Sequence, residues 1–374
     1  MKLNTLTSLA LAGTCVLASC TSTRDRKKVE EPKGPQLTVI AESQNQWTGV
    51  TVAPDGSLFV CYPRWSDSVP VSVERIDPAD PLDRTPFPNE EWNTWTDGAD
   101  PATHFVCVQS VVADAQNRLW VLDPANPNFE GVVPGGAKLV AFDIATGEVV
   151  KTFVFEEEYA PKDSYLNDVR IDLQHDTAYI TDSHAAALLV VNLQSGRTRR
   201  LLHSHPSVHS EQTPITIDGK TWGADGDSLP DVHVDGIALD EERDTLYYHA
   251  LTGARLYKIR TRWLRDTAMT AGKRGLRVRT VAETGPVDGM LFHPRRGVVL
   301  TDLEDHAVTC VDEEGVETVT VQDPRLAWPD TLAAGPDGSI YVTTSQIHLT
   351  PNPPAPYRLL KSTLPQAGLS SPEE

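Results

Sequence analysis

Residues 235–248 read DGIALDEERDTLYY: a polar residue and a glycine, a short alternating apolar run, a turn, and a second apolar run rich in tyrosine. Apolar and polar residues that alternate on both sides of a turn are typical of two antiparallel strands joined as a hairpin. The same pattern recurs five more times, at intervals of 42 to 68 residues. The other copies are TGVTVAPDGSLFV (48–60), QSVVADAQNRLWV (109–121), NDVRIDLQHDTAYI (167–180), DGMLFHPRRGVVLT (288–301) and DTLAAGPDGSIYV (330–342).

Six copies of one hairpin predict a repeat architecture. Dividing about 340 residues by six leaves about 57 for each unit, which is enough for a four-stranded blade and leaves no room for a second domain. A ring of six such blades has only short, protected strand edges. We therefore predict an all-β, single-domain, six-bladed β-propeller over residues 35–364, closed by pairing residues 37–41 with residues 357–361. A pair of β-sandwiches is the alternative, but its strands would not recur six times with the same polar start.

The N-terminal segment resembles an export signal. Lys2 is followed by an apolar stretch from Leu3 to Leu17, which is too short to span a bilayer but has the length of a secretory signal. It ends in LASC, the pattern of a bacterial lipobox, in which the cysteine is lipidated and becomes the mature N-terminus. We expect a lipoprotein signal peptide over residues 1–20 and a lipid anchor on Cys20. An ordinary secreted protein, in which Cys20 is incidental, is the alternative.

This signal sets the expected location of the protein. Residues 21–34 are polar and predict a flexible tether, and residues 365–374 predict a disordered tail. The protein is then exported and held on the cell envelope, at the outer membrane or its periplasmic face in a host that has one. We expect it to contact the membrane through the lipid anchor only and to be a monomer.

Charge and cysteine content exclude several classes of protein. The chain has 33 basic and 52 acidic residues and a net charge of −19, whereas a nucleic-acid-binding protein needs a basic surface. Outside the signal peptide and Cys20, three cysteines remain: Cys61, Cys107 and Cys310. Three cysteines cannot all pair within one chain, and buried free thiols are the favoured interpretation, with a disulfide between Cys61 and Cys107 as the alternative.

The first strand of each propeller blade lines the central channel, so the polar residues that open the six copies are expected to surround one mouth of this channel. We call these residues the polar ring: Thr48, Gln109, Asn167, Asp235, Asp288 and Asp330. Like charges about 6 Å apart, at an effective dielectric constant of about 20, repel by roughly 3 kcal/mol per pair. A bound divalent cation, a bound ammonium group or protonation of one carboxyl would relieve this repulsion. Alternatively, each Asp caps local backbone amides around a water-filled channel.

Longer segments resemble the major royal jelly protein and yellow family, in the correct order over nearly all of residues 37–362. They are LFVCYPRW (58–65), RLWVLD (118–123), YLNDVRID (165–172), AYITDS (178–183), DGIALDEERDTLYYHALTGARLYKIRTRWLRD (235–266) and LAWPDTLAAGPDGSIYV (326–342). The resemblance implies a six-bladed propeller, a secreted location, and either binding of an aromatic amine in the channel or a dopachrome-converting isomerase activity. These functions differ among members, so the family alone does not identify the chemistry.

The chain also resembles, more distantly, the gluconolactonase propellers, which hold a divalent metal in the channel. Their ligands are a Glu in the first blade, two Asn, and an Asp that precedes Gly. Asn167 and Asp235 match two of these positions, whereas Thr48 and Gln109 depart from the pattern. A divalent cation such as calcium at Asn167 and Asp235 is therefore the basis of an alternative, metal-dependent lactonase.

Two further features lie outside the ring. His203, His205 and His209 contain enough imidazoles for a metal site, although a solvated loop is the favoured interpretation. Residues 260–279 hold seven basic residues and one Asp, which predicts an exposed insertion at the outer edge of the fourth blade, with docking to an acidic partner as the alternative.

Three hypotheses follow. In the first, the channel binds a small cationic or aromatic molecule, with Asp235, Asp288 and Asp330 supplying charge and Asn167, Gln109 and Thr48 orienting the ligand. Arg64, Trp65, Trp47 and Trp328 flank the starts of these strands, where they either pack in the core or form an aromatic rim. The second hypothesis is the lactonase, and the third is an envelope scaffold that binds another protein and has an inert channel.

Overall fold

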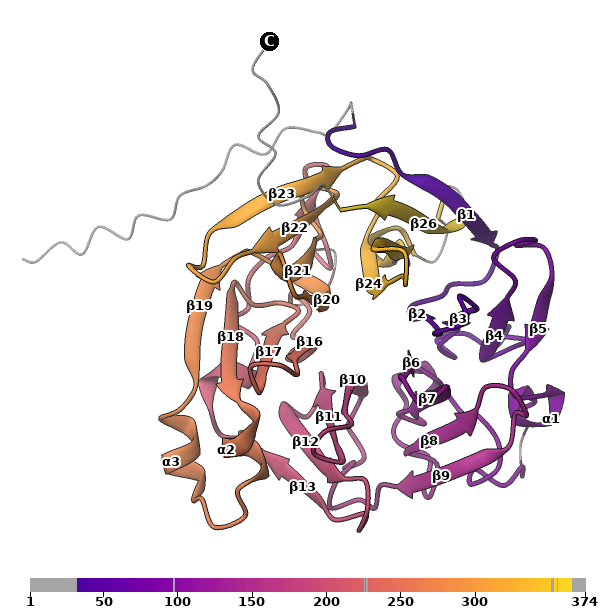
Figure 1. Ribbon diagram of the computed structural model, residues 1–374, viewed down its shortest axis with the longest axis horizontal. Helices are drawn as coiled ribbons and strands as arrows, with labels where there is room; N and C mark the ends of the chain where they lie inside the picture. The colour runs from indigo at the N-terminus through magenta and orange to yellow at the C-terminus, as the bar shows by residue number, and fades with distance from the viewer. Residues whose placement is uncertain are drawn as a thin grey trace, which may run out of the picture.

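The computed structural model describes residues 32–364, except residues 97, 225, 227, 351, 352 and 355. Six four-stranded antiparallel sheets surround a central channel in this part of the chain, with the first strand of each sheet next to the channel (Figure 1). The predicted all-β, six-bladed propeller is therefore confirmed.

The first three blades follow one another along the chain, and each runs from its inner to its outer strand. Blade one contains β2 (Val50–Val52), β3 (Leu58–Cys61), β4 (Val73–Ile76) and β5 (Arg84–Pro86). Blade two contains β6 (Ser110–Ala113), β7 (Arg118–Asp123), β8 (Lys138–Asp143) and β9 (Val149–Val154). Blade three contains β10 (Leu166–Asp172), β11 (Thr177–Asp182), β12 (Ala187–Asn192) and β13 (Thr198–Leu201).

The last three blades have the same order. Blade four contains β16 (Val234–Asp240), β17 (Thr245–Ala250), β18 (Arg255–Arg260) and β19 (Arg279–Glu283). Blade five contains β20 (Val287–His293), β21 (Gly297–Asp302), β22 (Ala307–Val311) and β23 (Glu317–Gln322). Blade six contains β24 (Pro329–Ala334), β25 (Ser339–Thr344), β26 (Tyr357–Thr363) and, as its outer strand, β1 (Thr38–Ser43).

Blade six closes the ring because its outer strand comes from the other end of the chain. Strand β1 pairs antiparallel with β26, placing Thr38 opposite Lys361 and Ser43 opposite Tyr357. This is the closure expected from the sequence. It removes one exposed sheet edge and joins the two ends of the propeller.

The apolar core lies between the blades. Each of six clusters of buried hydrophobic residues joins two neighbouring blades, as Phe59 of blade one and Val121 of blade two do within one cluster. Burial of these side chains drives packing of blade against blade, at about 25 cal/mol for each Å² of apolar surface removed from water. Polar residues at the starts of the inner strands therefore line the channel, whereas the apolar side chains point toward the neighbouring blades.

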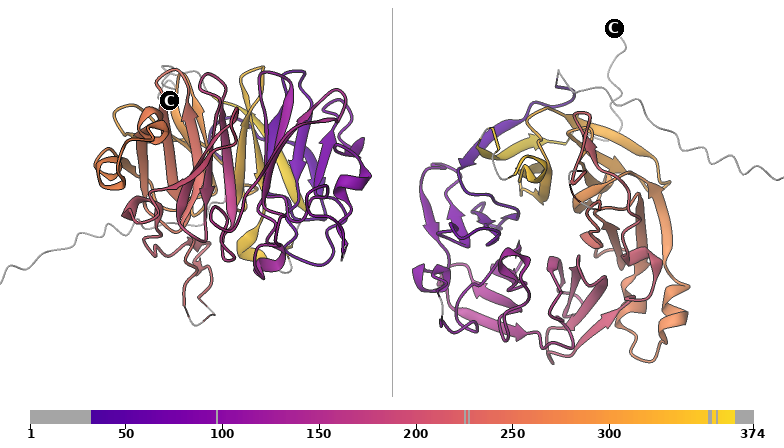
Figure 2. Two further views of the ribbon diagram at one scale, coloured as in Figure 1. Left: turned by 90° about the horizontal axis from the view of Figure 1, so that it is seen from below. Right: turned by 180° about the vertical axis from the view of Figure 1, so that it is seen from behind.

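Long connections gather on one face of the ring, where the loop between β13 and β16 and the 3-10 helix η3 (Ile347–Leu349) project together (Figure 2). The short elements among these and other connections are α1 (Glu90–Asn93), η1 (Pro127–Phe129), η2 (Pro206–Val208), β14 (Thr216–Ile217) and β15 (Lys220–Thr221). Two helices, α2 (Thr261–Arg265) and α3 (Ala271–Gly275), lie between β18 and β19. They form the expected outer-edge insertion of blade four (Figure 1).

Several predictions concern residues outside those described: the signal peptide over residues 1–20, lipidation of Cys20, most of the tether over residues 21–34, and the tail over residues 365–374. Lys33, at the end of the predicted tether, is described. Its backbone N–H donates to Gln322 O at 2.7 Å, and Gln322 N–H donates back at 2.9 Å, so this residue adds to the edge of blade five. None of the helices in the described part of the chain has the length and apolar composition needed to cross a membrane.

Candidate functional site

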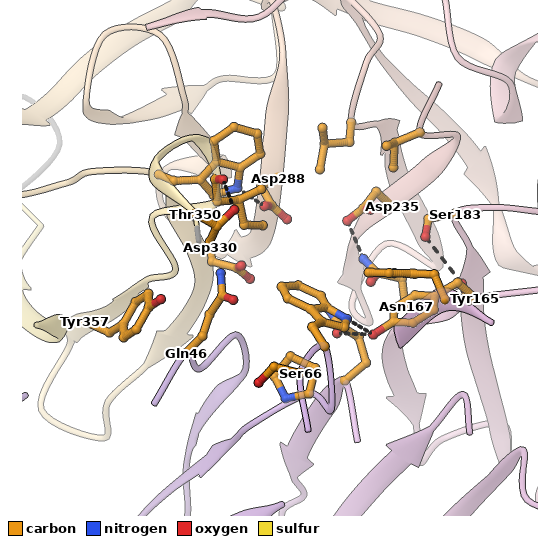
Figure 3. A pocket seen from close by; sticks show the side chains of 18 of the residues that line it. Gln46, Ser66, Tyr165, Asn167, Ser183, Asp235, Asp288, Asp330, Thr350 and Tyr357 are labelled. Carbon is orange, nitrogen blue, oxygen red and sulfur yellow. Dashed lines mark hydrogen bonds between the residues drawn. The ribbon is translucent and has the colours of Figure 1, made fainter. Parts of the chain in front are cut away.

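A cavity of about 590 Å³ opens at the channel mouth on the face that carries the long connections (Figure 3). Five of the six polar-ring residues line it: Gln109, Asn167, Asp235, Asp288 and Asp330. The side chains of Asp235, Asp288 and Asp330 point into this space from blades four, five and six (Figure 3). The structure therefore brings the three predicted carboxyls together at one site.

The sixth ring residue, Thr48, does not line the cavity, and its expected role in orienting a ligand is not supported. Its side chain is fully buried, and its hydroxyl donates to Gln109 O at 3.0 Å. Thr48 therefore joins blade one to blade two. Gln46 lines the cavity in its place, with its amide Nε2 donating to Ser345 O at 2.8 Å.

Irregular strand pairing positions the ring residues of blades three to six. The register of inner strand against second strand shifts around Asn167, Asp235, Asp288 and Asp330, and such a β-bulge reorients the side chain that it carries. In blade one, Thr48 N–H donates to Cys61 O at 3.1 Å and Cys61 N–H donates to Gly49 O at 3.2 Å, so Cys61 faces two residues there as well. The Thr48 side chain nevertheless turns toward blade two, where its hydroxyl donates to Gln109 O.

Glycine after Asp235 and after Asp288 allows the inner strands to approach closely. A Cβ at Gly236 would lie 2.2 Å from Asp288 O, and one at Gly289 would lie 1.8 Å from Asp330 O. Both distances are far below van der Waals contact, so only glycine fits. The second strand holds the bulge, because Thr301 Oγ1 accepts from Asp288 N–H at 3.2 Å and from Gly289 N–H at 2.9 Å.

The three carboxyls bind protons more tightly than free carboxyls do. Burial raises the pKa of Asp235, Asp288 and Asp330 well above the ordinary value, and neighbouring carboxylates raise it further. Asn167 Nδ2 donates to Asp235 Oδ1, and Trp328 Nε1 donates to Asp288 Oδ2 at 2.7 Å.

A fourth carboxyl and an arginine, neither of which was predicted, lie deeper in the channel. Burial raises the pKa of Asp168, while Arg170 at 3.7 Å and the Ser110 hydroxyl at 3.2 Å lower it. Arg170 extends from blade three to blade five, where its guanidinium donates to Met290 O at 2.5 Å. The sequence NDVRID contained a signal for both residues, because it places charged side chains on the inner strand of blade three.

Aromatic residues form two walls above the carboxyls. On one side Phe129 stacks on Trp65, with centroids 5.6 Å apart, and on His184, at 5.4 Å. Trp65 Nε1 donates to the Tyr165 hydroxyl at 2.6 Å, and this hydroxyl donates to Gln109 Oε1 at 2.9 Å. Phe129 remains 48% exposed, so its ring faces the open cavity.

The opposite wall contains Trp222 and Trp328, whose rings meet edge to face at 4.9 Å. Of the residues considered for an aromatic rim, Trp65 and Trp328 line the cavity. Trp47 is fully buried against Tyr62, and Arg64 donates to the carbonyls of Val106 and Val69. Trp47 and Arg64 therefore have structural roles.

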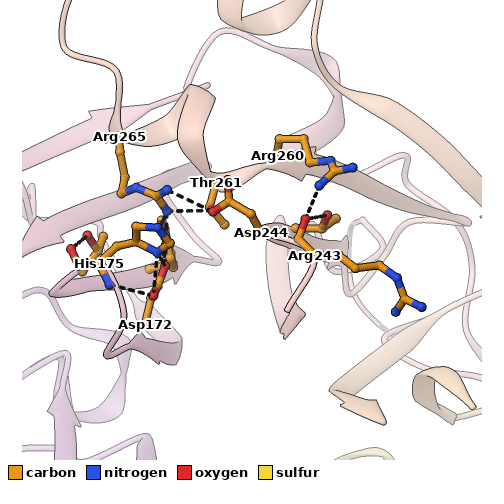
Figure 4. Close-up of polar contacts among 10 residues, drawn as sticks. Asp172, His175, Arg243, Asp244, Arg260, Thr261 and Arg265 are labelled. Carbon is orange, nitrogen blue, oxygen red and sulfur yellow. Dashed lines mark hydrogen bonds and ion pairs between the residues drawn. The ribbon is translucent and has the colours of Figure 1, made fainter. Parts of the chain in front are cut away.

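The channel residues do not fit the metal site of the gluconolactonase propellers. Thr48 is buried, and Gln109 Oε1 already accepts from the Tyr165 hydroxyl at 2.9 Å, so two of the four ligand positions present no unpaired oxygen to the channel. Elsewhere in the described chain, ligand atoms of Asp172, His175 and Asp244 lie within 4.8 Å of one another. Arg265 fills this cluster, with its guanidinium 3.2 Å from Asp172 and 3.0 Å from Asp244 (Figure 4).

The remaining candidates have structural partners. His209 Nε2 lies 2.9 Å from His203 O, whereas His205 Nδ1 lies 2.8 Å from Ser207 Oγ, so the three imidazoles do not converge on one point.

Cys61, Cys107 and Cys310 are free and buried, which confirms the favoured interpretation over a disulfide. Burial raises the pKa of the Cys61 and Cys107 thiols to about 12, which makes them unreactive near neutral pH.

Comparisons with known proteins agree with this architecture. The family model described as "Major royal jelly protein" matches residues 106–352. The chain is 25% identical to Protein yellow of Drosophila erecta over 232 residues, covering 57% of this chain and 41% of that protein. It is 23% identical to Dopaminechrome tautomerase of Drosophila melanogaster over 215 residues, covering 54% of this chain and 45% of that protein. The chain thus spans less than half the length of these relatives.

The fold is also shared with solved propellers. A gluconolactonase of Xanthomonas campestris superimposes with a TM-score of 0.51 and 15% identity, covering 88% of this chain and 90% of that one. At this identity the similarity concerns the fold alone.

Proposed function

Because the chain belongs to the major royal jelly protein family, whose model matches residues 106–352, we propose that it binds a small cationic aromatic molecule in the cavity at the channel mouth. The observation that carries this proposal is the placement of three buried carboxyls beneath two aromatic walls. The cavity volume of about 590 Å³ is within the range of roughly 300–1,000 Å³ that is typical of small-molecule sites.

Charge supports a cationic ligand. Asp168 has Arg170 as an ion-pair partner, but among the described residues no basic side chain forms an ion pair with Asp235, Asp288 or Asp330. An ammonium group placed among these carboxyls would stabilise their ionised forms and accept no proton from them. The ligand would therefore offset a repulsion that the protein itself leaves in place.

The walls support an aromatic ligand. The exposed ring of Phe129, stacked on Trp65, offers a flat face on one side of the cavity. Trp222, which packs edge to face on the fully buried Trp328, offers a second aromatic surface on the other side. Aromatic faces attract both aromatic rings and cations, so an arylalkylamine would use both walls and the acidic base at once.

A proton-transfer activity is a second candidate, and the Asp235–Asp288 pair favours it. Burial and neighbouring carboxylates raise the pKa of both carboxyls, so one can hold a proton while the other is ionised. A tautomerase needs such a pair, because one carboxylate removes a proton from carbon while a protonated neighbour returns one elsewhere on the same molecule. The relative named Dopaminechrome tautomerase makes an aminochrome a reasonable first substrate to test.

Location is a separate proposal, which rests on the sequence of residues 1–20 alone. We propose that the protein is exported and anchored through lipid on Cys20. Mass spectrometry of the mature N-terminus tests this: Cys20→Ser should leave a chain without lipid in the soluble fraction. An unmodified Cys20 in the membrane-free native protein would contradict the proposal.

The binding proposal is tested by thermal unfolding and calorimetric titration with tyramine, dopamine and tryptamine, each beside its neutral alcohol analogue. We expect the amines to raise the melting temperature and the alcohols to have little effect, because only the amines place a charge among the carboxyls. Asp330→Asn should weaken amine binding, whereas Asp337→Asn, an exposed carboxylate in the β24–β25 turn, is the matched control. Amines that give neither heat nor a thermal shift would overturn the proposal.

A further inference from the structure

A second cavity, of about 280 Å³, lies between blades four and five. It is at the opposite end of the blades from the channel mouth: Thr245, at the start of β17, lines this second cavity, whereas Leu251, just beyond the end of β17, lines the first. We call it the cationic groove. Five basic residues line it, namely Arg243, Lys258, Arg260, Arg277 and Arg279, together with the acidic residues Asp312 and Glu313 and the rings of Tyr247 and Phe292.

Strand pairing places like charges next to one another in this groove. Lys258 lies opposite Arg279 in the register of β18 with β19 and opposite Tyr247 in the register of β17 with β18. Residues directly opposite in antiparallel strands point to the same face, and like charges in such a pair are destabilising. Arg260, two residues from Lys258, is on this face as well. The fold therefore retains a repulsive row of cations.

Four of these five cations lack acidic partners. Among the described residues no carboxylate forms an ion pair with Lys258, Arg260, Arg277 or Arg279, although the chain carries a net charge of −19. Arg260 donates to the Arg243 carbonyl, Arg279 donates to the carbonyls of Leu276 and Val278, and Arg277 lies 4.9 Å from the Trp263 ring.

Two other basic residues, Arg243 in the groove and Arg265 outside it, have carboxylate partners, which makes the contrast informative. Arg265 pairs with Asp172 and Asp244, while Arg243 pairs with Asp240 and Glu313. Figure 4 shows Arg265 within its acidic cluster and Arg260 in contact with Arg243. Within the basic insertion, Arg265 therefore has a structural role, whereas Arg260, Arg277 and Arg279 have no carboxylate partner and line the groove.

From this geometry we infer that the cationic groove binds a soluble phosphorylated small molecule. Several arginines offer paired N–H donors that match phosphate oxygens, and Lys258 adds a further charge. Tyr247 and Phe292, stacked at 5.9 Å with an angle of 9° between the rings, provide a flat apolar surface beside them. The concave shape and small volume fit one phosphate group and an attached ring. This inference is independent of the function proposed for the channel.

Phenyl phosphate and inorganic phosphate are suitable probes, used with the mature chain in calorimetry and thermal unfolding. Binding of phenyl phosphate is expected, and inorganic phosphate should bind more weakly because it makes no ring contact. Arg279→Gln should weaken binding about tenfold, since a hydrogen bond to a charged group is lost. Lys273→Gln removes an exposed charge on α3 outside the groove and should leave binding unchanged.

Stability without a probe gives a second readout. Arg279→Gln removes one member of the Lys258–Arg279 pair, so its melting temperature in phosphate-free buffer should equal or exceed that of the native chain. If phenyl phosphate and inorganic phosphate both fail to bind the folded native chain, the proposal is wrong. Binding only to vesicles that contain phosphatidylglycerol would also overturn it, in favour of a membrane surface. If Lys273→Gln weakens binding as much as Arg279→Gln does, the attraction is a non-specific effect of charge and the proposed site is wrong.

Discussion

The indole N–H of Trp328 donates to the Asp288 carboxylate at 2.7 Å, which joins an aromatic wall of the channel cavity directly to its acidic base. The Trp328 backbone has a φ of 55°, a conformation that non-glycine residues adopt at a cost. Packing against Trp222 at 4.9 Å and His348 at 5.9 Å holds the ring in place. One residue thus positions both parts of the candidate site.

Replacing Trp328 with Phe tests this link. Trp328→Phe keeps an aromatic ring but removes the donor, so the pKa of Asp288 should rise further and amine affinity should fall about tenfold. The change should also destabilise the fold by about 2 kcal/mol, because a buried hydrogen bond to a charged group is lost. Titration with tyramine and urea unfolding measure the two effects. Trp222→Phe, in the same wall, is the control, and an equal loss of affinity in both variants would contradict the role of the bond.

The acidic cluster should make stability fall as pH rises. Asp235, Asp288 and Asp330 have pKa values raised above the ordinary 3.8, so the folded chain binds more protons than the unfolded chain in the window above about pH 4. Their stabilising contribution is complete below this window and is lost as pH rises through the raised values. The melting temperature of Asp330→Asn should therefore fall less with pH than that of the native chain. If the melting temperatures of the two chains change equally with pH, the cluster does not titrate in this way.

Amine binding should have the opposite pH dependence. An ammonium group binds the ionised carboxyls, so affinity should increase as pH rises through the raised pKa values, and binding should release protons. Calorimetry in two buffers with different ionisation enthalpies measures this release. The Asp337→Asn control should release as many protons as the native chain, because this exposed carboxylate is outside the cavity. Affinity that does not depend on pH would contradict the placement of the ammonium group.

The parts of this site that follow strand periodicity were predictable, and those that depend on packing were not. Asp235 and Asp288 could be found because each opens a repeated hairpin and precedes a glycine that the crowded channel requires. Thr48 occupies the same position in the repeat, but its hydroxyl turns into the protein and donates to Gln109 O, a packing contact that the repeat does not contain. Phe129 comes from a connection after β7, whose course depends on tertiary contacts that the hairpin pattern does not contain.

Glycine at the channel should be required for folding. In Gly289→Ala, the new Cβ would lie 1.8 Å from Asp330 O, so the inner strands of blades five and six must separate. We expect a loss of about 3 kcal/mol in the free energy of unfolding, measured with urea. Gly272→Ala is the matched control, since a Cβ there meets no atom within 4 Å and lies in helix α3. Equal stability of the two variants would show that the strands approach less closely than the structure indicates.

Calcium should have no specific effect on the channel. Thr48 is buried, and Gln109 Oε1 accepts from the Tyr165 hydroxyl, so a lactonase-type cation would lack two of its oxygen ligands. We therefore expect the melting temperature to be the same in EDTA and in millimolar calcium, and the same comparison in Asp235→Asn to show no calcium effect. A calcium-dependent rise in the native chain that disappears in Asp235→Asn would instead place a cation at this residue. Asp337→Asn serves as the control here too, because a rise lost in that variant would indicate calcium binding at the surface.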